Sequence, residues 1–130
     1  MVRLGEHGEY VKMMMNRFGF RYYSAAEEFL KGKSMLEDAC DREVAAKEGR
    51  SPIKSFTRVV QIDPKSPYGW AYLLFAMEDA GSFTVDQLLQ TADKWHEAAI
   101  EYRYQGQNAF AMMYFTRYMK IKQRGCENVP

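Results

Sequence analysis

Apolar residues recur along most of this chain with the spacing of an amphipathic helix. The segment 85–105 shows this pattern clearly, because Lys94, Glu97 and Glu101 lie opposite a continuous apolar face. That face consists of Leu88, Leu89, Ala92, Trp95, Ala99 and Tyr102. No segment shows the two-residue alternation of a strand, so the sequence predicts an all-α fold.

The starts of several helices are predicted from capping residues. Ser51 and Ser66 each offer a hydroxyl as an N-cap and are each followed by proline, which is tolerated at the first helical position. Thr84 begins a capping box in the sequence TVDQ, and Ser24 begins another in the sequence SAAE. Four helix starts are therefore expected at these serine and threonine residues.

Glycines mark the ends of the periodic segments, at Gly49, Gly81, Gly106 and Gly125. Gly32 is a candidate break inside one of the longer segments. Starts and stops together predict helices at about 6–18, 25–48, 52–62, 67–80, 85–105 and 108–123.

The last of these helices is apolar on every side over residues 109–115, AFAMMYF. A helix that is apolar all round is buried all round, so its outer side requires a cover. The N-terminal arm (residues 1–23), a second copy of the chain and a different protein are the candidates. The methionines at 13–15 are expected in the core, where the arm would supply this cover.

Composition limits the class of protein. The 130 residues are 47% hydrophobic and carry a formal net charge of +1, which excludes attraction of the whole domain to phosphate or acidic lipid. Cys40 and Cys126 form no disulfide framework, which favours an intracellular, cytoplasmic location and leaves organelle import open. The N-terminus lacks an apolar signal segment, and no apolar run reaches the length of about 18 residues needed to span a bilayer.

Residues 95–123 resemble the tetratricopeptide repeat (TPR), a helix–turn–helix unit with the pattern W-x2-L-G-x2-Y…A-x3-F…P. Gln123 stands in place of the final proline. Upstream, Phe56, Pro64 and Trp70 have the spacing of a junction between two units, and Leu36 and Cys40 occupy the large and small positions of an earlier helix. The positions that match in the last unit are Trp95, Ala98, Ala99, Tyr102, Gly106, Ala111 and Phe115.

The resemblance covers about residues 33–122 and is irregular, since the distance from Trp70 to Trp95 is shorter than one repeat. It implies antiparallel hairpins stacked as a short right-handed array of about five or six helices. We therefore expect an N-terminal arm or short helix at 1–23, a TPR-like domain at 24–125 and a disordered tail at 126–130.

The sequence favours a protein without catalytic activity. His96-Glu97 begins like the H-E-x-x-H zinc motif, but Ile100 stands where the second histidine is required, so His96 is expected to be partly exposed on a helix without metal. The acids of residues 27–43 are mixed with bases and indicate a solvated face. Cys40 is expected to be buried. No cofactor, metal or small-molecule substrate is predicted.

The TPR resemblance implies a protein-interaction module, an adaptor or scaffold subunit of a larger assembly. Ala71, Phe75, His96 and Ile100 stand where chaperone-binding TPR units have lysine and asparagine, so an apolar peptide or helix is the expected ligand. The predicted groove residues are Trp70, Leu74, Phe75, Ile100 and Arg103, and the predicted terminal interaction face is Phe110, Met113, Tyr114 and Arg117.

Two other interpretations remain open. The terminal face also suits a homodimer. Alternatively, the chain is an RNA-contacting subunit of a ribonucleoprotein, with bases stacking on Tyr114 and Tyr118 beside the basic side chains Lys120, Lys122 and Arg124. The competing explanation for these cations is that they complement the dipole at a helix C-terminus.

Overall fold

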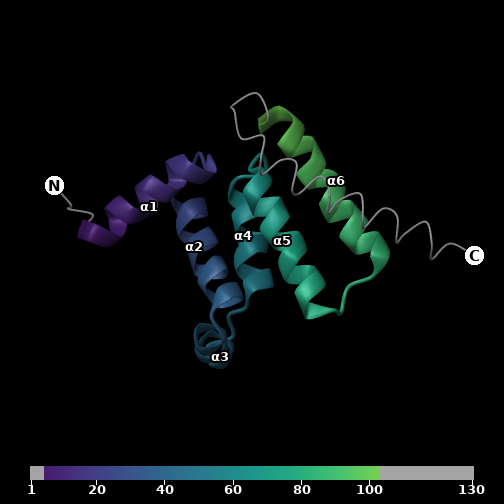
Figure 1. The fold of residues 1–130 in the computed structure, drawn as a ribbon, viewed down its shortest axis with the longest axis horizontal. Helices are drawn as coiled ribbons and strands as arrows, with labels where there is room; N and C mark the ends of the chain where they lie inside the picture. Colours follow the sequence, from purple (N-terminus) through teal and green to yellow (C-terminus); the bar gives the residue numbers. More distant parts are fainter. Residues whose placement is uncertain (1–4, 103–130) are drawn as a thin grey trace, which may run out of the picture. The chain divides into compact units, whose positions relative to one another are not determined.

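The computed structural model of the chain describes residues 5–102. Within that range the all-α prediction is confirmed, since every regular element is a helix. The chain divides into two compact units, which we call unit 1 (Met1–Pro64) and unit 2 (Lys65–Pro130). The helices, drawn in Figure 1, are α1 (Gly5–Phe18), α2 (Tyr23–Glu37), α3 (Ala39–Lys47), α4 (Pro52–Ile62), α5 (Pro67–Ala80) and α6 (Val85–Tyr102).

Three of the four predicted N-terminal caps are confirmed. The Ser51 hydroxyl accepts the backbone N–H of Lys54 at 3.2 Å at the start of α4. The Ser66 hydroxyl accepts that of Gly69 at 3.3 Å at the start of α5. Thr84 and Gln87 form the reciprocal capping box before α6, where each side-chain oxygen accepts the other residue's backbone N–H.

Both predicted glycine stops within the described residues are also confirmed. Gly49 and Gly81 have φ angles of 76° and 68°, in the left-handed region that L side chains avoid. The Gly81 N–H donates to the Met77 carbonyl at 3.2 Å and so closes the last turn of α5.

The boundaries of α2 differ from the prediction. The helix starts two residues earlier than a Ser24 cap requires, because Tyr22 takes the N-cap position without a side-chain hydrogen bond. It ends at Glu37, and Asp38 in extended conformation separates it from α3. The Asp38 carboxylate caps α3 by accepting the N–H groups of Cys40 and Asp41 at 2.8 and 3.1 Å. The break therefore lies at Asp38 and not at Gly32.

In unit 1, α2 and α4 lie side by side, and α3 lies at the end where the chain turns between them (Figure 1). Phe29 of α2 is fully buried at the centre of an aromatic cluster. Its ring centroid lies 4.9 Å from those of Phe18 and Phe20 and 5.9 Å from that of Phe56 on α4. These tilted contacts join α1, the loop after it, α2 and α4 in one core.

α2 and α4 approach each other closely at Gly32. A Cβ atom placed on Gly32 would lie 2.8 Å from Phe56 Cε1 and 2.9 Å from Phe56 Cζ, closer than real Cβ atoms approach carbon. The small residue opposite the ring is thus Gly32, whereas the repeat alignment gave that role to Cys40. Cys40 is exposed on α3, so the prediction that it is buried is wrong. The helix break at Asp38 carries it out of the interface.

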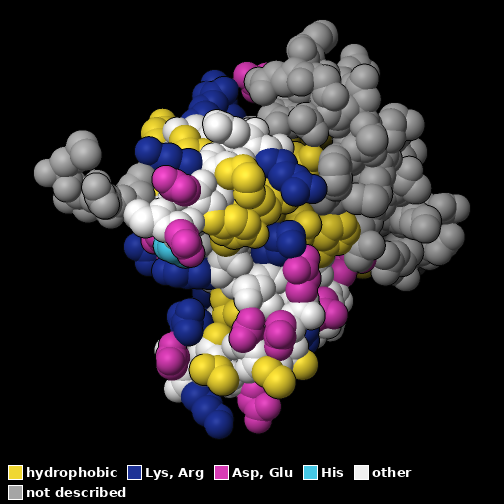
Figure 2. Space-filling view, turned by 60° about the vertical axis from the view of Figure 1, so that its left-hand side comes forward, with side chains coloured by type: hydrophobic (Ala, Val, Ile, Leu, Met, Phe, Trp, Pro, Cys, Tyr) yellow, Lys and Arg dark blue, Asp and Glu magenta, His cyan; other side chains and the backbone are white. Residues whose placement is uncertain are grey.

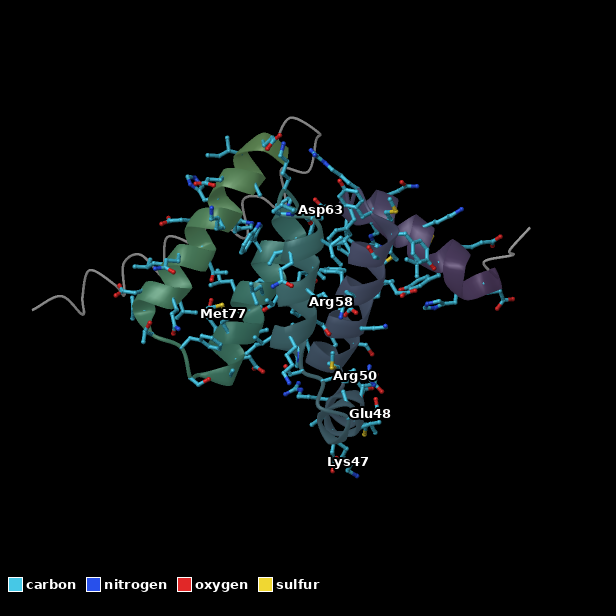
Figure 3. The ribbon with its side chains drawn as sticks, turned by 180° about the vertical axis from the view of Figure 1, so that it is seen from behind. Lys47, Glu48, Arg50, Arg58, Asp63 and Met77 are labelled. Atoms are coloured by element: carbon cyan, nitrogen blue, oxygen red, sulfur yellow. The ribbon has the colours of Figure 1, made fainter. Side chains whose placement is uncertain are left out.

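The buried Asp63 fixes the loop between α1 and α2. It follows the last residue of α4 (Figure 3), and its Oδ2 accepts the backbone N–H of Arg21 at 2.9 Å. A backbone N–H in a partly buried site needs such a partner, because leaving it unsatisfied is unfavourable. Asp63 therefore holds the end of α4 to the chain segment that leads into α2.

Replacing Asp63 with alanine is expected to lower the free energy of unfolding by about 1–3 kcal/mol, because the Arg21 N–H loses its acceptor. Urea denaturation followed by far-UV circular dichroism measures the change. Asp63→Asn is the matched control, since the amide oxygen still accepts a hydrogen bond, and it is expected to lose less than half as much stability. Equal losses in the two variants would contradict the hydrogen-bond explanation.

In unit 2, α5 and α6 pack against each other as a hairpin. Of the predicted inward positions of α6, Ala92, Trp95 and Ala99 are buried, at 0%, 1% and 7% exposure. Leu88 and Leu89 are only half-buried. Thr91 on the same helix donates its hydroxyl to the Met77 sulfur of α5 at 3.3 Å (Met77 is labelled in Figure 3). Small residues beside a large indole let two packed helices approach closely.

Met14 is buried and Met15 half-buried, as expected of core residues, but Met13 is 55% exposed. The expectation that all three methionines lie in the core is therefore wrong for Met13. α1 packs against α2, while the segment 108–123 that α1 was expected to cover lies outside the described residues. Of the helices described, none is both long enough and apolar enough to cross a membrane.

Candidate protein-binding surfaces

The groove residues predicted on α5 and α6 differ in exposure. Leu74 is buried, at 3% exposure, so it belongs to the core of unit 2. Trp70 and Phe75 are half-buried, and the Phe75 ring packs edge-on against Tyr72 with centroids 5.7 Å apart. Ile100 on α6 is 47% exposed. Trp70, Phe75 and Ile100 thus keep part of their surface exposed, whereas Leu74 does not.

The remaining predicted interaction residues lie outside the described residues. They are Arg103 of the groove, the terminal face of Phe110, Met113, Tyr114 and Arg117, and the basic residues Lys120, Lys122 and Arg124.

His96 is half-buried on α6, as its helical position predicts, with its ring centroid 6.3 Å from that of Trp95. Over residues 5–102, no three side chains of histidine, cysteine, aspartate or glutamate gather closely enough to hold a metal ion.

Unit 1 contains a concave surface that the sequence did not predict. This hollow has a volume of about 330 Å³ and lies between α2 and α3, with the start of α1 at its edge. Leu30, Met35, Val44 and Ala45 provide its apolar part. Met35 and Ala45 are buried, Leu30 is half-buried and Val44 is 56% exposed. We call this surface the α2–α3 hollow.

Polar contacts between α2 and α3 hold the walls of the α2–α3 hollow. Arg42 donates from Nε to the Met35 carbonyl at 3.0 Å and from Nη2 to the Leu36 carbonyl at 2.9 Å. These carbonyls belong to the last turn of α2, where a cation also complements the helix dipole. The Ser34 hydroxyl donates to the Asp41 carboxylate at 2.6 Å. The angle between the two helices is therefore set by specific hydrogen bonds as well as by packing.

The rim of the α2–α3 hollow carries both signs of charge. His7 of α1 lies 3.7 Å from Glu27 of α2, and Lys31, Asp41 and Arg50 complete the lining. Arg50 also binds Glu48 at 2.6 Å, beside Lys47 at the end of α3 (Figure 3). Figure 2 shows α3, at the bottom of the view, with acidic, basic and hydrophobic side chains interspersed on its exposed surface. Such a rim does not present the single-sign surface that attracts a polyanion.

A second depression, of about 490 Å³, follows α4, and all its described lining residues come from that helix. They include Ile53, Thr57 and Gln61, which lie one turn apart, and Arg58. Arg58 Nε lies 3.9 Å from Glu28 Oε1 of α2 (Arg58 is labelled in Figure 3). Because its described lining comes from a single helix, this surface offers a ligand less shape complementarity than the α2–α3 hollow does.

Local patterns did not identify the α2–α3 hollow, because its walls meet only through the break at Asp38. One signal was present in the sequence. Asp38 can act as an N-cap and Asp41 as an acid in the first turn, which is the pattern of a new helix start. The same segment also fits one continuous helix.

Comparison with protein-family models, curated proteins and solved structures gave no match. Over the described residues, the fold and site define an all-α protein with a concave, mixed-charge surface in unit 1.

Proposed function

We propose that this chain is a non-enzymatic protein–protein interaction module, an adaptor or scaffold subunit built from TPR-like hairpins. The observation that carries the proposal is the α2–α3 hollow, which combines apolar residues with a rim of both charges. Apolar pockets with a few placed polar groups are typical binding sites, and charged residues at the rim orient the ligand.

The size of the hollow favours part of a protein as its ligand. A volume of about 330 Å³ is at the lower end for drug-sized molecules, and it suits one or two apolar side chains of a partner segment. An amphipathic helix or extended peptide would place those side chains against Leu30 and Val44. Basic residues of the partner would then lie near Glu27 and Asp41, and its acidic residues would lie near Lys31 and Arg50.

A second contact region is proposed on unit 2, where Trp70, Phe75 and Ile100 keep part of their apolar surface accessible. Aromatic side chains are enriched among residues that dominate binding energy. We place the protein inside the cell, where the exposed thiol of Cys40 stays reduced.

Site-specific photo-crosslinking in the native source tests this function. With p-benzoylphenylalanine in place of Val44, which lines the hollow, a discrete set of crosslinked proteins is expected. The same group in place of the adjacent exposed Glu43, which is not among the lining residues, is the matched control. In a separate pull-down, Val44→Glu is expected to weaken retention of the identified partner by about tenfold, the scale of one hot-spot residue.

Equal crosslinking at positions 43 and 44, or none at position 44, would contradict the proposal. Products that disappear after ribonuclease treatment would instead support the RNA-contacting alternative. Far-UV circular dichroism of each variant checks that the helices are intact.

A further inference from the structure

α1 presents an exposed stripe on the side that does not pack against α2. Tyr10 is 47% exposed and Met13 is 55% exposed, two of the few large apolar side chains of the described residues with this much accessible surface. Glu6 lies one turn before Tyr10 and Arg17 one turn after Met13, and both are exposed. Spacings of four, three and four residues place all four on one side of the helix. We call these residues the α1 stripe.

The other side of the helix packs inward. Val11, Met14 and Phe18 are buried at 0%, 6% and 6% exposure, and α1 contacts α2. The α1 stripe is thus a second apolar surface, and core packing does not account for it. The helix dipole accounts for an acid in the first turn and a base in the last turn. It does not account for a tyrosine and a methionine exposed between them.

The α1 stripe is complementary to a second copy of itself that runs in the opposite direction. If two copies of α1 lie antiparallel about a two-fold axis between positions 10 and 13, Glu6 of one copy faces Arg17 of the other. Tyr10 then faces Met13 of the other copy, a favourable contact of sulfur with an aromatic ring. Every contact occurs twice, as two-fold symmetry requires. Parallel pairing would instead place like charges together.

We infer that the α1 stripe is a self-association surface, through which two copies of this chain pair by antiparallel contact of their α1 helices. A lipid surface is a poorer fit, because membrane-surface helices carry a basic polar face and this stripe has one acid and one base. The surface is separate from the α2–α3 hollow, and the inference does not depend on the proposed function.

Contact of two short helices buries little area, so the dimer is weak, with a Kd of roughly 0.1–1 mM. Its Glu6–Arg17 pairs are exposed, so salt weakens the association. Sedimentation equilibrium of the full chain at low and high ionic strength measures both properties. A chain that stays monomeric up to roughly 1 mM would overturn the inference.

Charge reversal tests the pairing. Glu6→Arg and Arg17→Glu each turn both opposite-charge contacts of the dimer into like-charge contacts. The Kd of dimerisation of each variant alone is therefore expected to be at least about tenfold higher than that of the native chain. An equimolar mixture of the two variants restores both opposite-charge contacts in a heterodimer. The mixture is therefore expected to associate at least as well as the native chain.

Two controls make the result specific. Lys12→Glu reverses an exposed charge on the opposite flank of α1 and is expected to leave association unchanged. Met13→Gln removes apolar surface without changing charge and is expected to weaken association about tenfold. Far-UV circular dichroism confirms that each variant retains its helices. Unchanged association in both charge variants, or no recovery in their mixture, would overturn the antiparallel arrangement.

Discussion

Replacing Phe29 with alanine lowers the free energy of unfolding of unit 1 by an expected 3–5 kcal/mol, roughly the loss for truncating a buried phenylalanine. The side chain is fully buried, and three other phenylalanine rings lie within 4.9–5.9 Å of it, centroid to centroid. Truncation removes these contacts and leaves a cavity that α1, α2 and α4 would all line. Because whole domains are stable by only about 5–15 kcal/mol, partial unfolding at ambient temperature is a realistic outcome.

Urea denaturation followed by far-UV circular dichroism measures the loss at Phe29. Tyr22→Ala is the matched control, since this aromatic residue in the same unit is 53% exposed, and its expected effect is within about 0.5 kcal/mol. Similar midpoints for the two variants would show that the phenylalanine cluster is not the core of unit 1.

Replacing Trp95 with alanine is expected to cost unit 2 about 3–5 kcal/mol. Trp95 is 1% exposed and lies among the small buried residues Ala92, Ala98 and Ala99 of α6. Alanine side chains are too short to move into the space that the indole leaves, so we expect a cavity to remain in the variant. Because the chain has only two tryptophans, Trp70 remains as a fluorescent reporter within unit 2 when Trp95 is replaced.

The measurement is urea denaturation followed by tryptophan fluorescence, which comes from Trp70 alone in Trp95→Ala and from both tryptophans in the native chain and the control. Ile100→Ala on the same helix is the control, and its expected effect is within about 0.5 kcal/mol because this side chain is 47% exposed. If Trp95→Ala unfolds at the same urea concentration as Ile100→Ala, the hairpin of α5 and α6 is not held together by its indole.

The helix boundaries that sequence predicted correctly depend on residues close together in the chain. Ser51 and Ser66 cap helices through the N–H group three residues later, and Gly81 ends a helix through its own backbone conformation. Interactions of this range are present in any short window of the sequence, so capping rules recognise them.

The errors in the fold prediction involve residues whose partners are distant in sequence. Gly32 lies inside α2, and its missing side chain leaves the space that the Phe56 ring occupies. Cys40 fits the repeat alignment by spacing, but the helix ends before it, at Asp38. A local pattern does not reveal which of two candidate breaks the tertiary structure selects.

The same reasoning applies to the sites. Sequence correctly placed Trp95 and Ala99 on an inward face, because that depends on helical phase alone. The α2–α3 hollow depends on the angle between two helices, to which the hydrogen bonds of Arg42 and Ser34 contribute. No periodicity encodes that angle. The exposure of Tyr10 and Met13 likewise depends on which side of α1 packs into the core.

The contact of Gly32 with the Phe56 ring has a consequence for the way this chain can change during evolution. The two positions compete for one volume, so a methyl group gained at position 32 requires the Phe56 ring to move or to be replaced by a smaller side chain. Either substitution alone passes through a less stable intermediate, whereas alanine at 32 together with leucine at 56 keeps the helices at similar separation. Descendants of this sequence should therefore tend to vary at both positions together, and that covariation would mark the α2–α4 contact even where the remaining sequence has diverged.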